Sequence, residues 1–181
     1  IANLIILGAA VVVYSGNRFE KSFLQDVREQ LSQAPSSSEL LTIADVAHLP
    51  TPVQRYLEYA GTIGQPKVHN MVVTFQGRMR SKDQDWLHFT SQQFNDFSNP
   101  ARLFFMKAKV KGLPTYGYHA YRNQQASMRI KILSLVPVVD LGTEELFRTE
   151  TVTFFNDMCL LAPAALIDPR IQWEPIDSAS C

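Results

Sequence analysis

An alternation of apolar and polar side chains runs from Val68 to Val139, and it constrains the fold more than any other feature of the chain. Successive side chains of a β-strand point to opposite faces of the sheet, so a period of two predicts strands. The clearest run, residues 106–111, alternates methionine, alanine and valine with three lysines. We therefore expect a sheet with one apolar face and one wet face.

The connections between these runs are short. Gly112 and Pro114 mark one turn, and Asn123 and Gln124 mark another. A parallel crossover needs a dozen or more residues, whereas these connections have only a few, so neighbouring strands are expected to be antiparallel. The sequence thus predicts a meander.

A helix is expected to follow the sheet. Thr143 can cap it, two glutamates in its first turn complement the positive helix end, and Pro163 ends it. Its apolar stripe includes Phe154 and Met158 and needs a partner, for which the apolar face of the sheet is the obvious candidate. The predicted fold class is α+β: a curved antiparallel β-sheet, an incomplete barrel, with a helix packed on one face and N-terminal helices before it. This shape resembles lipoprotein-carrier folds of the LolA type, by analogy only.

Residues 1–16 are expected to be part of a transmembrane segment. Residues 2–14 carry no charge, and Tyr14 is of the kind that settles at a membrane interface. A bilayer span takes about 20 apolar residues, so this run is interpreted as the end of a longer segment. A signal-peptide core and a buried strand are the alternatives. The first interpretation predicts a single-pass membrane anchor, with the side of the soluble domain left open.

Two further regions follow this segment. Residues 17–47 are expected to form a juxtamembrane helix and a serine-rich linker, because apolar side chains recur every four residues from 19 to 31. Residues 48–181 are expected to form the α+β domain, which begins with a helix that Thr51 caps and Gly61 closes. The segment 173–177 is typical of the opening of a further strand, so this domain is expected to be truncated at its C-terminus.

The charge and cysteine content exclude several classes of protein. Seventeen basic side chains balance seventeen acidic ones, so a nucleic-acid partner is not expected. The two cysteines, Cys159 and Cys181, are far apart in the sequence, and no cysteine or histidine lies near either of them at the spacing of a zinc-binding motif. No metal site is therefore predicted. No phosphate-binding loop, dinucleotide fingerprint or nucleophile elbow is present, and no cofactor is predicted.

The candidate catalytic residues are scattered along the sequence, so no catalytic residue is assigned. An enzyme is therefore the less favoured class of protein. His88 and His119 are predicted to lie in strands and could meet across the sheet, although the ordinary interpretation is polar-face or rim histidines. Asp157 lies in an otherwise apolar stretch of helix, where aspartate is a poor helix former. A buried partner is therefore expected for it, and Arg55, Arg78 and Arg80 are the candidates.

Aromatic and methionine side chains are the most suggestive feature of the chain. Seven of them are predicted to point into the space between the sheet and the late helix, and these are the candidate ligand-binding residues: Phe75, Phe104, Met106, Tyr118, Met128, Phe154 and Met158. An ordinary packed core is one interpretation. The other is a hydrophobic cavity, because unbranched methionine adapts to irregular ligands and small-molecule sites are mostly apolar.

The order of several motifs resembles an uncharacterised bacterial family of unknown function, DUF6544, also labelled DUF6920. The motifs are Leu-Pro-Thr-Pro-Val-Gln-Arg-Tyr-Leu-Glu-Tyr-Ala-Gly (49–61), Gly-Arg-Met-Arg (77–80), Gly-Leu-Pro (112–114), Leu-Ser-Leu-Val-Pro-Val-Val-Asp (133–140), Glu-Thr-Val-Thr-Phe-Phe-Asn-Asp-Met-Cys (150–159), Ala-Pro-Ala-Ala-Leu-Ile (162–167) and Trp-Glu-Pro-Ile-Asp (173–177). The resemblance implies a membrane-associated protein, at the bacterial inner membrane, with more strands after residue 177. It implies no activity and no catalytic residue.

The leading hypothesis is the binding or carriage of a hydrophobic, lipid-like ligand at a membrane. It rests on the uncharged N-terminal run, the one-sided apolar sheet and the lack of a catalytic motif. The alternatives are a hydrolase that uses Asp140, Asp157 or His119, and a structural module of the cell envelope.

Overall fold

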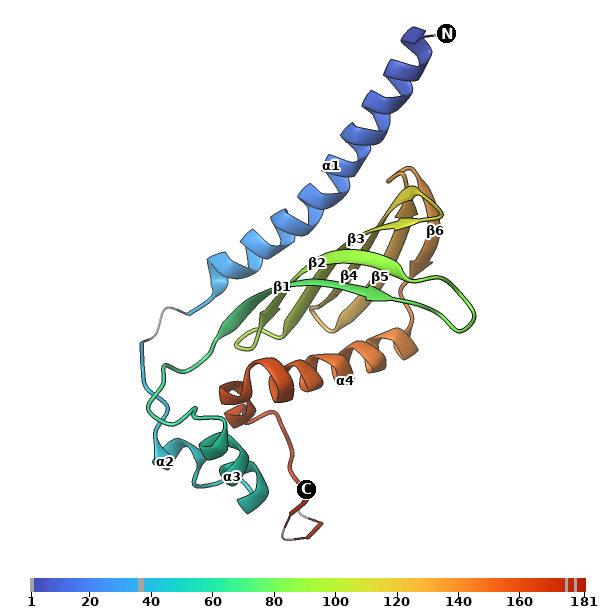
Figure 1. The fold of residues 1–181 in the computed structure, drawn as a ribbon. Coiled ribbons are helices and arrows are strands. Elements are labelled where there is room, and N and C mark those ends of the chain that lie inside the picture. Colours follow the sequence, from blue (N-terminus) through green and yellow to red (C-terminus); the bar gives the residue numbers. More distant parts are fainter. Residues whose placement is uncertain (1, 36–37, 175, 178) are drawn as a thin grey trace.

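The computed structural model describes residues 2–35, 38–174, 176, 177 and 179–181 (Figure 1). The helices are α1 (Ala2–Gln33), α2 (Ile43–Val46), α3 (Thr51–Tyr59), α4 (Glu144–Leu161) and the 3₁₀-helix η1 (Pro163–Ile167). The strands are β1 (Asn70–Met79), β2 (Leu87–Asp96), β3 (Ala101–Val110), β4 (Leu113–Arg122), β5 (Gln125–Ile132) and β6 (Val136–Leu141). The predicted α+β class is therefore confirmed.

The six strands form one curved, unclosed sheet in the order β1-β2-β3-β4-β5-β6, and each pairs antiparallel with its neighbours. The predicted meander is confirmed, because every connection is too short for a crossover. Strand β6 lies at the end of the alternating region and contains Pro137. The proline is accommodated because β6 is an edge strand and the register shifts between Ile130 and Lys131, opposite Pro137.

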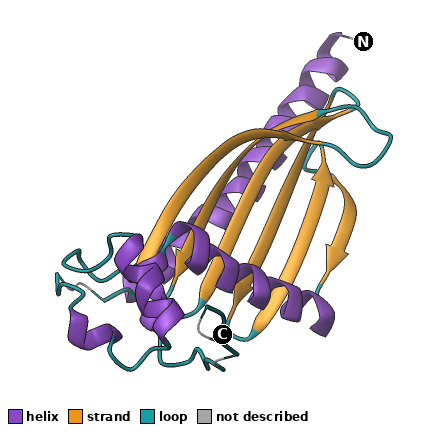
Figure 2. Ribbon diagram, turned by 60° about the horizontal axis from the view of Figure 1, so that its bottom comes forward, coloured by secondary structure: helices purple, strands orange, loops and turns teal. Residues whose placement is uncertain are grey.

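Helix α4 packs on one face of the sheet, as predicted (Figure 2). Its first turn is capped by Thr143, whose hydroxyl accepts a hydrogen bond from the Leu146 amide. Phe154 and Met158 are buried against Phe97 and Tyr121. This apolar cluster continues into α2, α3 and η1, so α4 joins the small N-terminal helices to the sheet.

Helix α1 covers the opposite face, and the expectation of a wet face is therefore wrong. Phe19 and Phe23 are buried against Phe105 and Tyr118 on that face. This face of the sheet carries both apolar and basic side chains, and α1 supplies carboxylates to pair with the basic ones. Lys107, for example, pairs with Glu20 at 2.7 Å. A sheet face with basic side chains can therefore be covered by a helix when that helix carries acidic side chains that pair with them.

The predicted membrane segment, residues 1–16, and the predicted juxtamembrane helix lie in the region of α1. α1 is one continuous helix from Ala2 to Gln33. Across the residues that the structure describes, no helix is both long and apolar enough to cross a membrane. Ser36 and Ser37 of the predicted linker, like Pro175 of the expected further strand, lie outside the described residues, and residues 171–174, 176 and 177 form no strand.

The helix predicted at the start of the α+β domain begins differently from the expectation. Pro50, and not Thr51, occupies the N-cap position of α3, and no side chain caps it, because Thr51 already lies within the first turn. Gly61 follows the helix with a φ of 69°, which confirms the left-handed closing residue. The side-chain cap in this region belongs to α2, where Thr42 and Asp45 form a capping box.

Candidate ligand-binding site around helix α4

Cross-strand pairing orders the side chains on the α4 side of the sheet into four rows. Row 1 is Met71, Asn95, Arg102, Tyr121 and Ala126; row 2 is Val73, Gln93, Phe104, His119 and Met128; row 3 is Phe75, Ser91, Met106, Gly117 and Ile130; row 4 is Gly77, Phe89, Ala108, Thr115 and Ile132. Helix α4 contacts rows 1 and 2: Tyr121 stacks on Phe147, and His119 contacts Glu150. Rows 3 and 4 extend beyond these contacts.

A buried polar cluster holds α4 to rows 1 and 2. We call it the Arg102 cluster, and it comprises Gln93, Asn95, Arg102, His119, Glu150 and Asp157. The Arg102 guanidinium donates to Glu150 at 3.0 Å, to Asp157 at 2.8 Å and to Gln93 at 3.1 Å. The amides of Gln93 and Asn95 also donate to Asp157, at 2.7 and 3.0 Å. Both carboxylates thus pair with the Arg102 guanidinium and have further hydrogen-bond partners, which is what burial of ionised groups requires.

The buried partner expected for Asp157 exists, but its identity was predicted wrongly. Arg102 fills the role that was assigned to Arg55, Arg78 or Arg80. Arg78 pairs with His88 in the sheet register and alternates with Gly77 of row 4, so its side chain lies on the α1 face. Arg55 is exposed on α3. The place where α4 crosses the sheet decides which basic residue meets Asp157. The periodicity of the sequence carries no information about that place.

The electrostatics of the Arg102 cluster favour a fixed ion-pair network over acid–base catalysis. Burial alone would raise the pKa of Glu150, but the hydrogen bond with His119 and the charge of Arg102 outweigh it and lower the pKa below its usual value. Glu150 therefore stays ionised at neutral pH. A pair of catalytic carboxyls needs environments that push the two pKa values apart, with one acid kept protonated. Glu150 does not meet that condition.

The other candidate catalytic residues do not converge. His88 lies on the α1 face and His119 on the α4 face, so the hypothesis that they meet across the sheet is wrong. Asp140 is exposed on the edge strand β6, and burial raises the pKa of Cys159, which weakens it as a nucleophile. Within the described parts of the chain, no group of three His, Cys, Asp or Glu side chains is arranged to hold a metal ion.

Six of the seven predicted ligand-binding residues share the α4 side of the sheet. Phe104 and Met128 belong to row 2, and Phe75 and Met106 belong to row 3, all of them half-buried. Phe154 and Met158 are buried on α4.

Tyr118 is the exception, and its predicted position is wrong. It is completely buried on the α1 face, where its hydroxyl donates to Asp26 at 2.5 Å. Burial, the hydrogen bond and the charge of Asp26 all raise the pKa of Tyr118. The error arose because both faces of β4 carry tyrosine, so the period of two does not reveal which face meets α4.

An apolar cavity of about 690 Å³ lies beside α4 and contains two of the predicted ligand-binding residues. We call it the α4 cavity, and its apolar walls include Tyr121, Val152, Phe154, Phe155, Met158, Ile171 and Trp173. Asp168, Arg170 and Glu174 also line it, and Arg170 is held by Asp168. The sequence reasoning missed Ile171 and Trp173, because they follow the last predicted helix in a segment without regular structure.

A second apolar area lies on rows 3 and 4, beyond the contacts of α4. Phe75, Phe89, Met106, Ile130 and Ile132 are half-buried there, and we call them the distal apolar surface. The absence of a side chain at Gly117 leaves space in row 3: a Cβ at that position would lie 3.8 Å from Ile130 and 3.9 Å from Met106. Phe89 was missed as a site residue, although the alternation of its strand places it on this side.

The fold and the site together define an α+β protein whose antiparallel sheet is covered by a helix on each face, with an apolar cavity beside one of them. A model described as a family of unknown function, DUF6544, matches residues 39–181. The chain belongs to this family, which confirms the resemblance seen in its motifs. No curated protein and no solved structure matches the chain.

Proposed function

We propose that the protein binds a hydrophobic, lipid-like ligand in the α4 cavity and that it does so at a membrane. The observation that carries the proposal is an apolar cavity of about 690 Å³ whose walls include Phe154 and Met158. Ligand sites typically occupy roughly 300–1,000 Å³ and are lined mainly by hydrophobic and aromatic side chains. The α4 cavity meets both conditions.

The lining residues favour an apolar ligand with a polar group. Met158 is flexible and polarisable, and Phe155 and Trp173 present aromatic surface 6.0 Å apart between ring centres. Asp168 and Arg170 line the same cavity and already satisfy one another, so a polar head group can lie near them without leaving an unpaired charge.

Native mass spectrometry after gentle extraction of the protein from its source tests the proposal. We expect the wild-type protein to retain co-purifying lipid or another hydrophobic molecule. Val152→Trp is expected to abolish this extra mass, because Val152 lines the cavity and is exposed, so an indole at this position fills the cavity without disturbing a core. Leu160→Trp is the matched control: it adds the same ring to an exposed position of the same helix, outside the cavity.

Three outcomes would contradict the proposal. The first is a wild-type protein that extracts with no bound molecule, and the second is equal loss in the Val152 and Leu160 variants. The third is a Met106→Ser variant that loses the ligand while the Val152 variant keeps it, because that result would move the site to the distal apolar surface. The hydrolase and the envelope module stay predictions, and the geometry favours neither.

A further inference from the structure

Charge is distributed very unevenly along a chain whose net charge is zero. Residues 70–132, which include strands β1 to β5, carry ten Lys and Arg side chains and only three Asp and Glu. Residues 133–181 carry two basic and eight acidic side chains. The net charge of zero is therefore the sum of a strongly basic sheet and an acidic C-terminal region.

Most of these basic side chains lie on the α1 face, and α1 forms ion pairs with two of them. Glu20 pairs with Lys107 at 2.7 Å, and Asp26 pairs with Arg122 at 2.9 Å. Glu20 is the first acidic residue of the chain, so the part of α1 that precedes it supplies no carboxylate. Basic residues nearer the β1–β2 and β3–β4 turns are therefore left without partners from this helix.

Five basic residues gather at that end of the sheet, and we call them the distal basic group: Arg78, Arg80, Lys82, Lys109 and Lys111. Among the residues that the structure describes, none of the five forms an ion pair. Arg78 and Arg80 instead lie over the ring of Trp86, at 5.1 and 4.8 Å from its centre. Only Asp83 and Asp85 offset this charge within the same hairpin.

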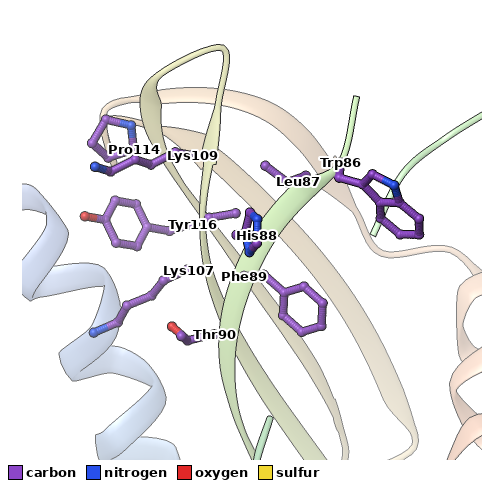
Figure 3. Close-up of a pocket in the computed structure, with 10 residues that line it drawn as sticks. Trp86, Leu87, His88, Phe89, Thr90, Lys107, Lys109, Pro114 and Tyr116 are labelled. Atoms are coloured by element: carbon purple, nitrogen blue, oxygen red, sulfur yellow. The ribbon is translucent and has the colours of Figure 1, made fainter. Parts of the chain in front are cut away.

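A cavity of about 550 Å³ opens beside the distal basic group (Figure 3). His88, Lys107 and Lys109 line it together with the hydroxyl-bearing Thr90 and Tyr116. Figure 3 shows Lys107, Lys109 and Tyr116 extending to the side where α1 lies, whereas Trp86 and Phe89 extend away from it. Lys107 is paired with Glu20, whereas Lys109 forms no ion pair with a described residue. The Lys109 ammonium and the hydroxyl donors of this cavity suit phosphate oxygens, which are strong acceptors of charge-assisted hydrogen bonds.

The same end of the molecule carries an exposed apolar helix. α1 lies against the sheet at Gly16, where an added Cβ would be 3.6 Å from the hydroxyl oxygen of Tyr116. On the N-terminal side of Gly16, the exposed large apolar side chains among the described residues are Ile6, Leu7, Val11, Val13 and Tyr14. Figure 1 shows this part of α1 extending past the strand ends. Apolar and basic surfaces are therefore adjacent.

We propose that this end docks on the surface of a bilayer rich in anionic lipid, with the apolar part of α1 in the interface and the distal basic group on the head-group phosphates. Burial of apolar helix surface and attraction to anionic lipid are the two contributions that hold proteins at such an interface. A soluble anion would leave the apolar helix without a partner, and a neutral bilayer would leave the basic group without one. The inference rests on the proposed function only for the statement that the protein works at a membrane.

Co-sedimentation of the complete chain with vesicles tests this inference. The vesicles contain phosphatidylcholine alone, or phosphatidylcholine mixed with phosphatidylglycerol. We expect stronger binding to the mixed vesicles, and a loss of binding as salt is added. In the variant Lys109→Gln with Lys111→Gln, binding should weaken about 25-fold, because each basic residue near an anionic surface contributes about a factor of five.

The matched control is Arg55→Gln with Arg148→Gln, which removes the same charge from exposed positions on α3 and α4. Its binding is expected to equal that of the parent. Equal binding to both kinds of vesicle, or equal weakening of the two double variants, would overturn the inference. So would retention of a short oligonucleotide by a protein that binds no vesicle. If vesicle binding fails while a hydrophobic ligand still co-purifies, the docking surface is refuted and the α4 cavity is not.

Discussion

Replacement of Arg102 by methionine is the sharpest test of how α4 is held to the sheet. Methionine keeps most of the apolar stem but removes the guanidinium, which leaves Glu150 and Asp157 without the cation that lies 3.0 and 2.8 Å away. The side chain of Arg102 is 10% exposed, so water cannot replace the lost partner. Removing one partner of a buried ion pair typically costs about 3–5 kcal/mol, and two carboxylates are stranded in this case.

Urea unfolding of the complete chain at a series of pH values measures this cost. In the parent the pKa of Glu150 lies below its ordinary value of 4.5, so its stabilising contribution is present above pH 4.5 and is lost as the pH falls through the lowered native pKa. In the variant, burial without Arg102 raises the pKa of Glu150, and the two unpaired carboxylates destabilise the fold when they are ionised. The loss of stability is therefore expected to be largest at neutral pH and to shrink as the pH falls.

A companion variant separates charge from packing. Arg102→Met combined with Glu150→Gln and Asp157→Asn removes the stranded charges at the same positions, and we expect it to recover most of the lost stability at neutral pH. The reasoning is refuted if Arg102→Met alone costs less than about 1 kcal/mol, the range of exposed ion pairs, or costs the same at acidic and neutral pH.

Three further substitutions test other contacts, each by urea unfolding. Phe23→Ala should cost about 3–5 kcal/mol, because Phe23 is buried against Phe105 and Tyr118 on the α1 face; a change below about 1 kcal/mol would mean that α1 is not docked there. Tyr118→Phe should cost about 1.5 kcal/mol through the lost hydrogen bond to ionised Asp26, and equal stability of the two proteins would argue against that bond. Gly61→Ala should cost about 1–2 kcal/mol, because its φ of 69° suits glycine, and a stabilised variant would contradict the left-handed closure of α3.

Much of the fold was predictable because it depends on local periodicity. The period of two in β3 and β4 predicts strands, and the few residues between them make these strands antiparallel neighbours. The cap at Thr143 and the break at Pro163 place the limits of α4. Strand β6 contains Pro137, which would be unfavourable in the interior of a sheet and is tolerated because β6 is an edge strand.

The candidate site was less predictable, because it depends on which elements meet. The apolar and methionine residues of rows 2 and 3 were identified from alternation alone, whereas Tyr118 was assigned to the wrong face. Asp157 was expected to have a basic partner, yet Arg102 lies 55 positions earlier in the chain and no pattern links the two. The cavity residues after α4, such as Trp173, have no periodic signal at all.

The sequence by itself determined the local elements: the strands, their antiparallel order, the limits of the late helix and the presence of an amphipathic N-terminal helix. These properties follow from side-chain period, turn length and capping, which act over a few residues. Only the tertiary structure decided that α1 covers the second face of the sheet, that Arg102 joins Glu150 to Asp157, and that uncompensated basic residues gather beside an exposed apolar helix. Helix-to-sheet packing fixes such neighbours by shape and charge over long sequence distances, and a one-dimensional pattern does not contain that information.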